Sequence, residues 1–277
     1  MTQAPTAGRA PAGRQVLALV RASHPGPTVA VTALASAYAM SLGQPADVLA
    51  LVAAAVLAGQ LSIGWCNDVV DVARDRQVGR ADKPVATGEV PLSVVRAACA
   101  LALVATVVLS LATGLLAGLV HLVCVAAGWA YDLGLKATAL SWVPYAVAFG
   151  LLPGFVSLAD PGGWPAWSVL LAAALLGVGA HLLNAVPDLA DDAATGVRGL
   201  PHRLGARRST VLAVAALGAA TLPLVLSVPE VSLAARATVA VLVAGCAVAA
   251  LTGRGRWPFR AAIAIAALDV VLLVVAA

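Results

Sequence analysis

The chain has 277 residues, of which 61% are hydrophobic and 11% are charged, and its formal net charge is +4. In soluble proteins about a quarter of the residues are charged, so this composition excludes an ordinary soluble domain and indicates an all-α polytopic membrane protein. The positive balance does not indicate a nucleic-acid partner, because no basic patch is interleaved with aromatic residues. The four cysteines lack paired spacing, which favours packing roles over disulfide or metal roles: Cys66, Cys99, Cys124 and Cys246.

Residues 1–26 contain proline, glycine and arginine and lack the long apolar core of a signal peptide, so we interpret them as a cytoplasmic tail. Residues 27–277 are expected to form a single transmembrane domain. A helix needs about 20 apolar residues to cross roughly 30 Å of hydrocarbon. Nine segments meet this requirement: 27–45, 47–66, 91–113, 115–132, 141–158, 167–186, 209–227, 231–251 and 257–275.

Basic residues give the orientation of these segments, because lysine and arginine collect on the cytoplasmic side of a membrane. With a cytoplasmic N-terminus, all of the 17 basic residues except Arg236 lie on that side. The sequence therefore predicts an integral protein of the cell (plasma) membrane with its C-terminus outside. Asp269 lies alone in the last segment, and we expect it to hydrogen-bond another helix or to lie near the outer interface.

The second apolar segment is followed by the polar stretch "NDVVDVARDRQVGRADKP", residues 67–84. Asn67, Asp71 and Asp75 are four residues apart and project from one face if the helix continues past the membrane edge. Acidic side chains are costly near hydrocarbon unless cations neutralise them. Oxygen ligands suit Mg²⁺, which often completes its coordination shell with phosphate oxygens. The stretch therefore predicts a magnesium site that holds a diphosphate.

The sixth apolar segment is followed by a related stretch, "NAVPDLADDAATGVRGLP", residues 184–201. A shift of 117 residues aligns five of its residues with the first stretch, and the aligned ligand candidates are Asn184, Asp188 and Asp192. Four predicted spans separate the two stretches, so both face the cytoplasm. This spacing indicates parallel pseudo-repeats around residues 47–158 and 167–275, with the two polar stretches facing one cavity.

Basic residues follow each acidic trio. Arg80 and Lys83 follow the first, and Arg198 and Arg203 follow the second. All four are placed to contact phosphate oxygens that the metal ions leave free. The alternative interpretation is that they are ordinary basic anchors at the cytoplasmic face.

The segments "NDVVDVARD", "DKPVATGEV", "YDLGLKATALSWVPYAVAFGLLPG" and "NAVPDLADDAATGVRGLPHRLG" together resemble the intramembrane aromatic prenyltransferase (UbiA) superfamily. The resemblance covers nearly the whole chain. It implies a helical bundle with a lateral portal to the lipid and a capped polar cavity on the cytoplasmic side. It also implies Mg²⁺-dependent transfer of a prenyl group from an isoprenyl diphosphate to an acceptor, through an allylic carbocation.

The resemblance extends to individual positions. Tyr131 and Lys136 match a family element near the reacting carbon, where the tyrosine ring faces the cation and the lysine holds the diphosphate or acceptor. Arg21 matches a position that lines the acceptor pocket, and His181 either lines the cavity or packs as a polar residue. Four positions depart from the family pattern: Asn184 stands where an aspartate is frequent, Ala185 and Ala190 where acidic residues are frequent, and Gly199 where a threonine is common.

Three functions agree with these features to different degrees. The first is a prenyltransferase that acts within the membrane lipid on a hydrophobic or aromatic acceptor. This acceptor is an aromatic acid, a quinone precursor or a lipid, and a sugar phosphate is a further alternative. The alternative is a membrane terpene cyclase on the same scaffold, which acts on an isoprenyl diphosphate without an acceptor. A transporter is disfavoured, because its polar residues usually lie at the membrane midplane, whereas these lie at span ends.

Overall fold

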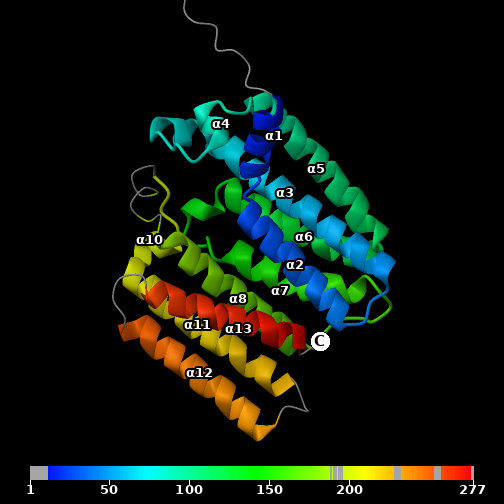
Figure 1. The fold of residues 1–277 in the computed structure, drawn as a ribbon, viewed down its shortest axis with the longest axis vertical. Coiled ribbons are helices and arrows are strands. Elements are labelled where there is room, and N and C mark those ends of the chain that lie inside the picture. Colours follow the sequence, from blue (N-terminus) through cyan, green and yellow to red (C-terminus); the bar gives the residue numbers. More distant parts are fainter. Residues whose placement is uncertain are drawn as a thin grey trace, which may run out of the picture.

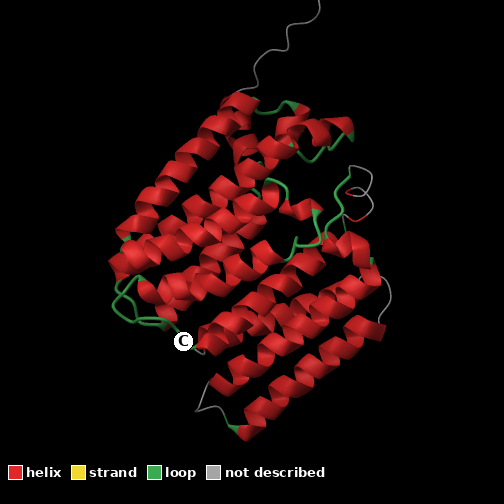
Figure 2. Ribbon diagram, turned by 180° about the vertical axis from the view of Figure 1, so that it is seen from behind, coloured by secondary structure: helices red, strands yellow, loops and turns green. Residues whose placement is uncertain are grey.

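We analysed a computed structural model of the chain, which is helical throughout its described residues and contains no β-strand there (Figure 1, Figure 2). The described residues are 12–187, 189, 192, 196–227, 232–252 and 257–275. The helices of the first half are α1 (Ala12–Arg21), α2 (Pro25–Ser41), α3 (Ala46–Gln77), α4 (Pro84–Thr87), α5 (Leu92–Ala112), α6 (Leu115–Asp132) and the 3₁₀ turn η1 (Leu135–Ala137). Those of the second half are α7 (Val143–Leu158), α8 (Trp167–Ala185), α10 (Leu200–Leu204), α11 (Ala206–Ser227), α12 (Leu233–Thr252) and α13 (Trp257–Val275).

Each of the nine predicted apolar segments coincides with one helix, and the all-α prediction is confirmed. Among the described residues, five helices are long and apolar enough to cross a membrane: α3, α5, α6, α8 and residues Ala206–Val225 of α11. Two shorter apolar helices are α7 and residues Arg236–Thr252 of α12. The chain is thus a helical membrane protein, and the number of nine crossings stays a prediction.

Large apolar side chains cover the outer faces of α5 and α12. Leu101 on α5 and Val241 on α12 are each 71% exposed, and Val104, Val108 and Leu242 are exposed beside them. Exposing this much apolar surface to water costs free energy, whereas contact with lipid tails carries no such cost. These two faces therefore fit a hydrocarbon surrounding.

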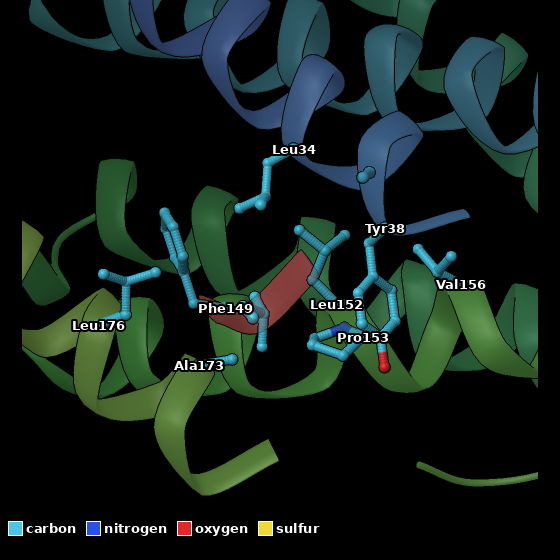
Figure 3. Close-up of a pocket in the computed structure, with 10 residues that line it drawn as sticks. Leu34, Tyr38, Phe149, Leu152, Pro153, Val156, Ala173 and Leu176 are labelled. Atoms are coloured by element: carbon cyan, nitrogen blue, oxygen red, sulfur yellow. The ribbon is translucent and has the colours of Figure 1, made fainter. Parts of the chain in front are cut away.

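Consecutive helices pack side by side through both halves of the bundle (Figure 1). In the first half α2 contacts α3, α3 contacts α5, and α6 contacts both α5 and α7; in the second half α8, α11, α12 and α13 follow one another. The contact between α6 and α7 joins the halves, α7 packs on α8, and the contact between α13 and α2 closes the bundle. Tyr38 of α2 meets Leu152 and Val156 of α7 in the core between the halves (Figure 3).

Helix α3 has 32 residues. At roughly 1.5 Å per residue it is about 48 Å long, well beyond the roughly 30 Å of a hydrocarbon core. Its last turns, which carry the start of the first polar stretch, are therefore expected to project beyond the hydrocarbon. Helices α1, α4 and α10 lie toward the same end of the bundle (Figure 1).

The predicted tail contains more structure than its sequence indicated. Residues 12–21 form α1, whose Ala18 is buried in a small core with Ala22, Val85 and Val95. The mostly apolar run between Arg14 and Arg21 in this helix is too short to span a membrane. Residues 1–11 lie outside the described part of the chain.

Candidate active site

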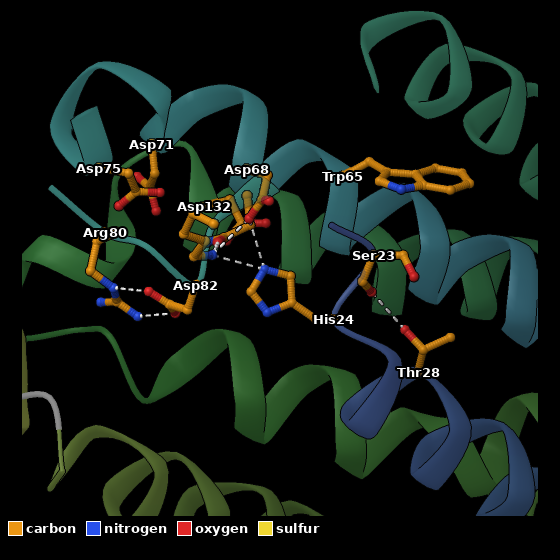
Figure 4. Close-up of polar contacts among 12 residues, drawn as sticks. Ser23, His24, Thr28, Trp65, Asp68, Asp71, Asp75, Arg80, Asp82 and Asp132 are labelled. Carbon is orange, nitrogen blue, oxygen red and sulfur yellow. Dashed lines mark hydrogen bonds and ion pairs between the residues drawn. The ribbon is translucent and has the colours of Figure 1, made fainter. Parts of the chain in front are cut away.

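The first acidic trio lies on the projecting end of α3. The helix runs without interruption to Gln77, so Asn67, Asp71 and Asp75 occupy successive turns of one face, as their spacing predicted. Asp71 is 6% exposed and Asp75 is 2% exposed. Figure 4 shows their two carboxylates side by side. Buried carboxylates at this density require nearby positive charge.

Two basic side chains supply part of that charge to Asp71. Lys136 Nζ donates to both carboxylate oxygens of Asp71, at 2.7 and 2.6 Å. Arg74 Nη2 donates to Asp71 Oδ2 at 3.0 Å, and Arg74 Nε lies 3.8 Å from Asp75 Oδ1. The turn η1 thus brings Lys136 onto the first trio, although 65 residues separate it from Asp71.

Lys83 joins a second cluster beside Asn67. Lys83 Nζ donates to Asp68 Oδ1 at 2.7 Å and to Asn67 Oδ1 at 3.3 Å. His24 Nε2 lies 3.0 Å from Asp68 Oδ1 and 3.1 Å from Lys83 Nζ (Figure 4). His24 precedes α2 with a φ of 54°, and no other described residue except glycine has a positive φ. This backbone turns its ring toward α3.

Asp132 at the end of α6 completes the polar cluster. Asn67 Nδ2 donates to Asp132 Oδ1 at 2.9 Å, so the amide group of Asn67 has its nitrogen on Asp132 and its oxygen toward Lys83. Asp132 is 3% exposed, and its Oδ2 atom has no hydrogen-bond partner among the described residues. An acceptor atom buried in this way is available to a ligand.

A cavity of about 250 Å³ opens beside this cluster. Its polar rim includes His24, Asn67, Tyr131, Asp132 and Asn184, and the polar side chains of Ser23, Thr28 and Gln60 also line the cavity. Its far wall is apolar and includes Val31, Ile63, Ala148 and Phe149. The cavity therefore offers polar contacts at one end and hydrocarbon contacts at the other.

Aromatic side chains form a row along this cavity. The ring centroids of Tyr131 and Tyr145 are 5.3 Å apart in an edge-to-face arrangement, and those of Tyr145 and Phe149 are 6.2 Å apart. His181 lies 4.8 Å from the Tyr145 ring and is buried, with its Nε2 3.0 Å from Ser141 Oγ. His181 is absent from the described lining, so it supports the two tyrosines from behind.

The second trio departs from its expected geometry. Helix α8 ends at Ala185, so Asn184 is its only member on that helix. Pro187 has no backbone N–H to donate, which ends the helix before the next acidic residue. Asn184 lines the cavity and hydrogen-bonds the Tyr145 side chain. Asp192 Oδ2 lies 3.4 Å from His202 Nε2, while Asp188 lies outside the described residues.

The remaining basic candidates contact residues of neighbouring loops and helix ends. Arg80 donates two hydrogen bonds of 2.8 Å to Asp82, and these bonds lower the pKa of Asp82 to about 2. Arg198 is exposed, and its carbonyl oxygen accepts a bond of 3.1 Å from Arg203 Nε. Arg21 is also exposed and forms an ion pair of 2.9 Å with Glu89, outside the described cavity lining.

The comparison with known proteins agrees with this arrangement. The model of the UbiA prenyltransferase family matches residues 28–268. The chain belongs to this family. None of the curated protein sequences matches it significantly.

Solved structures of UbiA homologues share the fold. A homologue from Aeropyrum pernix K1 has a TM-score of 0.70 and 20% identity, covering 88% of this chain and 96% of its own. A homologue from Archaeoglobus fulgidus bound to GPP and Mg²⁺ has a TM-score of 0.68 and 16% identity, covering 94% and 100%. A structure reported for digeranylgeranylglyceryl phosphate synthase has a TM-score of 0.66 and 18% identity, covering 95% and 96%. At these identities the likeness shows the fold.

Gly199, where the sequence departs from the UbiA pattern, lies at a close contact between the second polar stretch and the segment that follows α6. A Cβ atom on Gly199 would lie 2.5 Å from the Lys136 carbonyl oxygen and 3.0 Å from Ser141 Oγ. The next amide, of Leu200, donates to the same Ser141 Oγ at 2.9 Å. The absent side chain lets the second stretch pack directly on the turn that carries Lys136.

The donor atoms of this UbiA family member suit a hard cation. Within the described ranges no three histidine, cysteine or acidic residues form a ready metal cluster. The first trio nevertheless presents two buried carboxylates and an amide oxygen, and Asp132 Oδ2 lies unpartnered beside them. Oxygen donors of this kind fit Mg²⁺ when substrate and water complete the shell.

The site residues that sequence reasoning missed include His24, Arg74, Asp132 and Tyr145. Asp132 directly follows Tyr131 in "YDLGLK", so an acid at the end of a span was the available signal. Arg74 lies within the first polar stretch, three residues after Asp71, which is a spacing at which helical side chains meet. His24 lies in "RASHPGPT", and nothing in the sequence indicates its left-handed backbone.

Proposed function

We propose that this UbiA family protein transfers a prenyl group from an isoprenyl diphosphate to an acceptor within the membrane, through an allylic carbocation. The observation that carries the proposal is the buried carboxylate pair of Asp71 and Asp75 next to a cavity that is polar at one end and apolar at the other. Family membership and the homologue bound to GPP and Mg²⁺ support it.

Mg²⁺ is the cofactor in this proposal. Bound Mg²⁺ would neutralise diphosphate charge and so favour departure of the leaving group. Its protein ligands would come from both polar stretches: Asn67, Asp71, Asp75, Asn184, Asp188 and Asp192.

Basic side chains of the protein stabilise the same leaving group. Lys83 lies against Asn67 and is placed to donate to phosphate oxygens. Lys136 donates to Asp71 in this structure, and we propose that it turns its ammonium group toward a bound diphosphate when Mg²⁺ neutralises that carboxylate. Arg80, Arg198 and Arg203 are proposed to approach from the loops. Positive groups that are already in position stabilise the negative charge that develops on the diphosphate as the carbon–oxygen bond breaks.

The tyrosine pair faces the position of the cation in this mechanism. Tyr131 lines the cavity, and Tyr145 meets it edge to face. Aromatic ring faces attract a cation within about 6 Å. The apolar wall beyond them excludes water, which would otherwise add to the carbocation.

The polar rim favours a transferase over a cyclase. Asp132 Oδ2 and His24 meet the cavity beside Tyr131, where a hydroxyl-bearing aromatic, quinone precursor or lipid could hydrogen-bond. A cyclase needs only an apolar wall to fold its chain. Because Arg21 pairs with Glu89 outside the described lining, we assign the acceptor end to His24 and Asp132.

We also propose nine membrane crossings, with the cavity open to the cytoplasm and the protein in the plasma membrane. Support comes from the basic residues, which gather at the end of the bundle that holds α1, α4 and α10. The loop between α7 and α8, at the other end, has no lysine or arginine.

The metal site is tested by diphosphate release from labelled isoprenyl diphosphates, with Mg²⁺ or with EDTA. Asp71→Asn should lower release at least about a hundredfold, since it removes a charged ligand. Asp47→Asn is the matched control, because Asp47 is exposed at the opposite end of the same helix. Undiminished release in EDTA would contradict the proposal.

The same assay separates transferase from cyclase. Donor alone should turn over slowly, and candidate acceptors or a membrane extract should raise diphosphate release. Efficient conversion of donor alone into a cyclic product would overturn the transferase and leave the metal site standing.

A further inference from the structure

An apolar gap lies directly beyond the end of the cavity, on the other side of Phe149. It measures about 10 Å³, and Phe149 lines both the gap and the cavity. Figure 3 shows the gap between α2, α7 and α8, with Leu34, Leu152 and Leu176 around it. Except for Tyr38, its lining side chains are entirely apolar. The Phe149 side chain therefore separates a large space from a small one in the same apolar region.

Close packing of α7 on α8 holds Phe149 at this boundary. A Cβ atom on Gly177 of α8 would lie 2.5 Å from the Tyr145 carbonyl oxygen and 2.7 Å from Phe149 Cβ. One residue along α7, a Cβ on Gly150 would lie 3.0 Å from the Ala174 Cβ. The ring of Phe149 also stacks on Tyr145. The backbone thus cannot move away from α8 at Phe149 without losing these contacts.

The polarity of the cavity indicates how a bound isoprenyl diphosphate, the prenyl donor, is oriented. Its diphosphate belongs at the end with Asn67, and its reacting carbon near Tyr131. The hydrocarbon chain then passes Tyr145 and reaches Phe149 along the aromatic row. The volume of about 250 Å³ lies below the roughly 300–1,000 Å³ of pockets that enclose drug-sized ligands.

We propose that Phe149 sets the maximum length of the prenyl chain. The inference rests on the proposed function and specifies its donor: dimethylallyl and geranyl diphosphate fit in front of Phe149, whereas farnesyl and geranylgeranyl diphosphate meet its ring. Removing the ring joins the cavity to the gap and lets a longer chain pass between α2 and α8.

The experiment compares the four donors with purified wild type, Phe149→Ala and Phe149→Leu. Wild type should have a kcat/KM at least about tenfold lower for farnesyl than for geranyl diphosphate, the scale of discrimination that apolar pockets achieve. Phe149→Ala should abolish or reverse that ratio, and Phe149→Leu should change it partly. Inhibition by non-reactive thiolo analogues of the same lengths should shift in parallel, which provides a readout independent of chemistry.

Phe155→Ala and Phe155→Leu are the matched controls. Phe155 lies on the same helix and is fully buried, but it lines neither space. These variants should keep the wild-type length ratio whatever their stability, and the leucine pair serves if the alanine variants do not fold. Equal use of all four donors by wild type, or an unchanged ratio in both Phe149 variants, would overturn the inference. Absence of diphosphate release from every donor would instead count against the proposed function.

Discussion

Asp71 shows how single residues organise this site. It is nearly buried, yet Lys136 and Arg74 both donate to its carboxylate. Removing one partner of a buried ion pair leaves an uncompensated charge, which typically costs more than the pair contributes. Lys136→Met should therefore lower stability as well as activity, whereas Lys136→Arg should preserve much of the stability.

A testable consequence at the residue scale concerns Gly199. Gly199→Ala should lower the free energy of unfolding by about 1–3 kcal/mol, because the new methyl group overlaps the Lys136 carbonyl oxygen. Gly218→Ala is the control, since a Cβ there meets nothing within 4 Å and alanine favours the helix by up to about 1 kcal/mol. Thermal unfolding in detergent measures both. Equal melting temperatures for the two variants would mean that Gly199 does not pack against the turn that carries Lys136 as described.

At the scale of elements, α11 and α13 meet through a polar contact inside an apolar core. Thr221 Oγ1 donates to Asp269 Oδ1 at 2.6 Å, and Asp269 Oδ2 has no partner among the described residues. The expectation that Asp269 hydrogen-bonds another helix is confirmed. Both side chains are buried, so the hydrogen bond offsets only part of the cost of burying a carboxyl group.

This contact gives a prediction for the two helices. Thr221→Val should destabilise by about 1–3 kcal/mol, because it leaves Asp269 without a donor. Asp269→Leu should be neutral or stabilising, and the double variant should be more stable than Thr221→Val alone. A double-mutant cycle of thermal unfolding isolates the coupling. Additive effects of the two changes would show that the hydrogen bond contributes nothing.

The membrane-length helices could be predicted from the sequence because the length of an apolar segment is enough to indicate each of them. The shared face of Asn67, Asp71 and Asp75 on α3 could be predicted because their four-residue spacing requires only an unbroken helix. The same prediction was wrong for the second trio, because α8 ends at Ala185, just before Pro187, and leaves only Asn184 on the helix. Contacts across the bundle, such as Lys136 with Asp71, depend on how η1 and α3 pack. The positions of His24 and Asp132 depend on backbone turns that periodicity does not encode.

For the whole molecule, orientation follows from the distribution of charge. In a cysteine-free background, a membrane-impermeant thiol reagent applied from outside should label a cysteine at Gly162 and miss cysteines at Gly79 or Gly196. Gly162 lies in the loop between α7 and α8, and the other two lie within the polar stretches. Permeabilised cells are the control and should allow labelling at all three positions. Labelling of all three in intact cells would contradict the predicted crossings.

The length of α3 has one more consequence for the proposed reaction. Because the helix is about 18 Å longer than a hydrocarbon core of roughly 30 Å, we expect its acidic end to lie at the aqueous side of the membrane while its middle lies within the hydrocarbon. The two products differ in the same way, since the released diphosphate is soluble in water and the prenylated product dissolves in the bilayer. Each can leave by partitioning into the phase that it already faces. Turnover would then need no step in which the charged diphosphate crosses hydrocarbon or the apolar prenylated product crosses water.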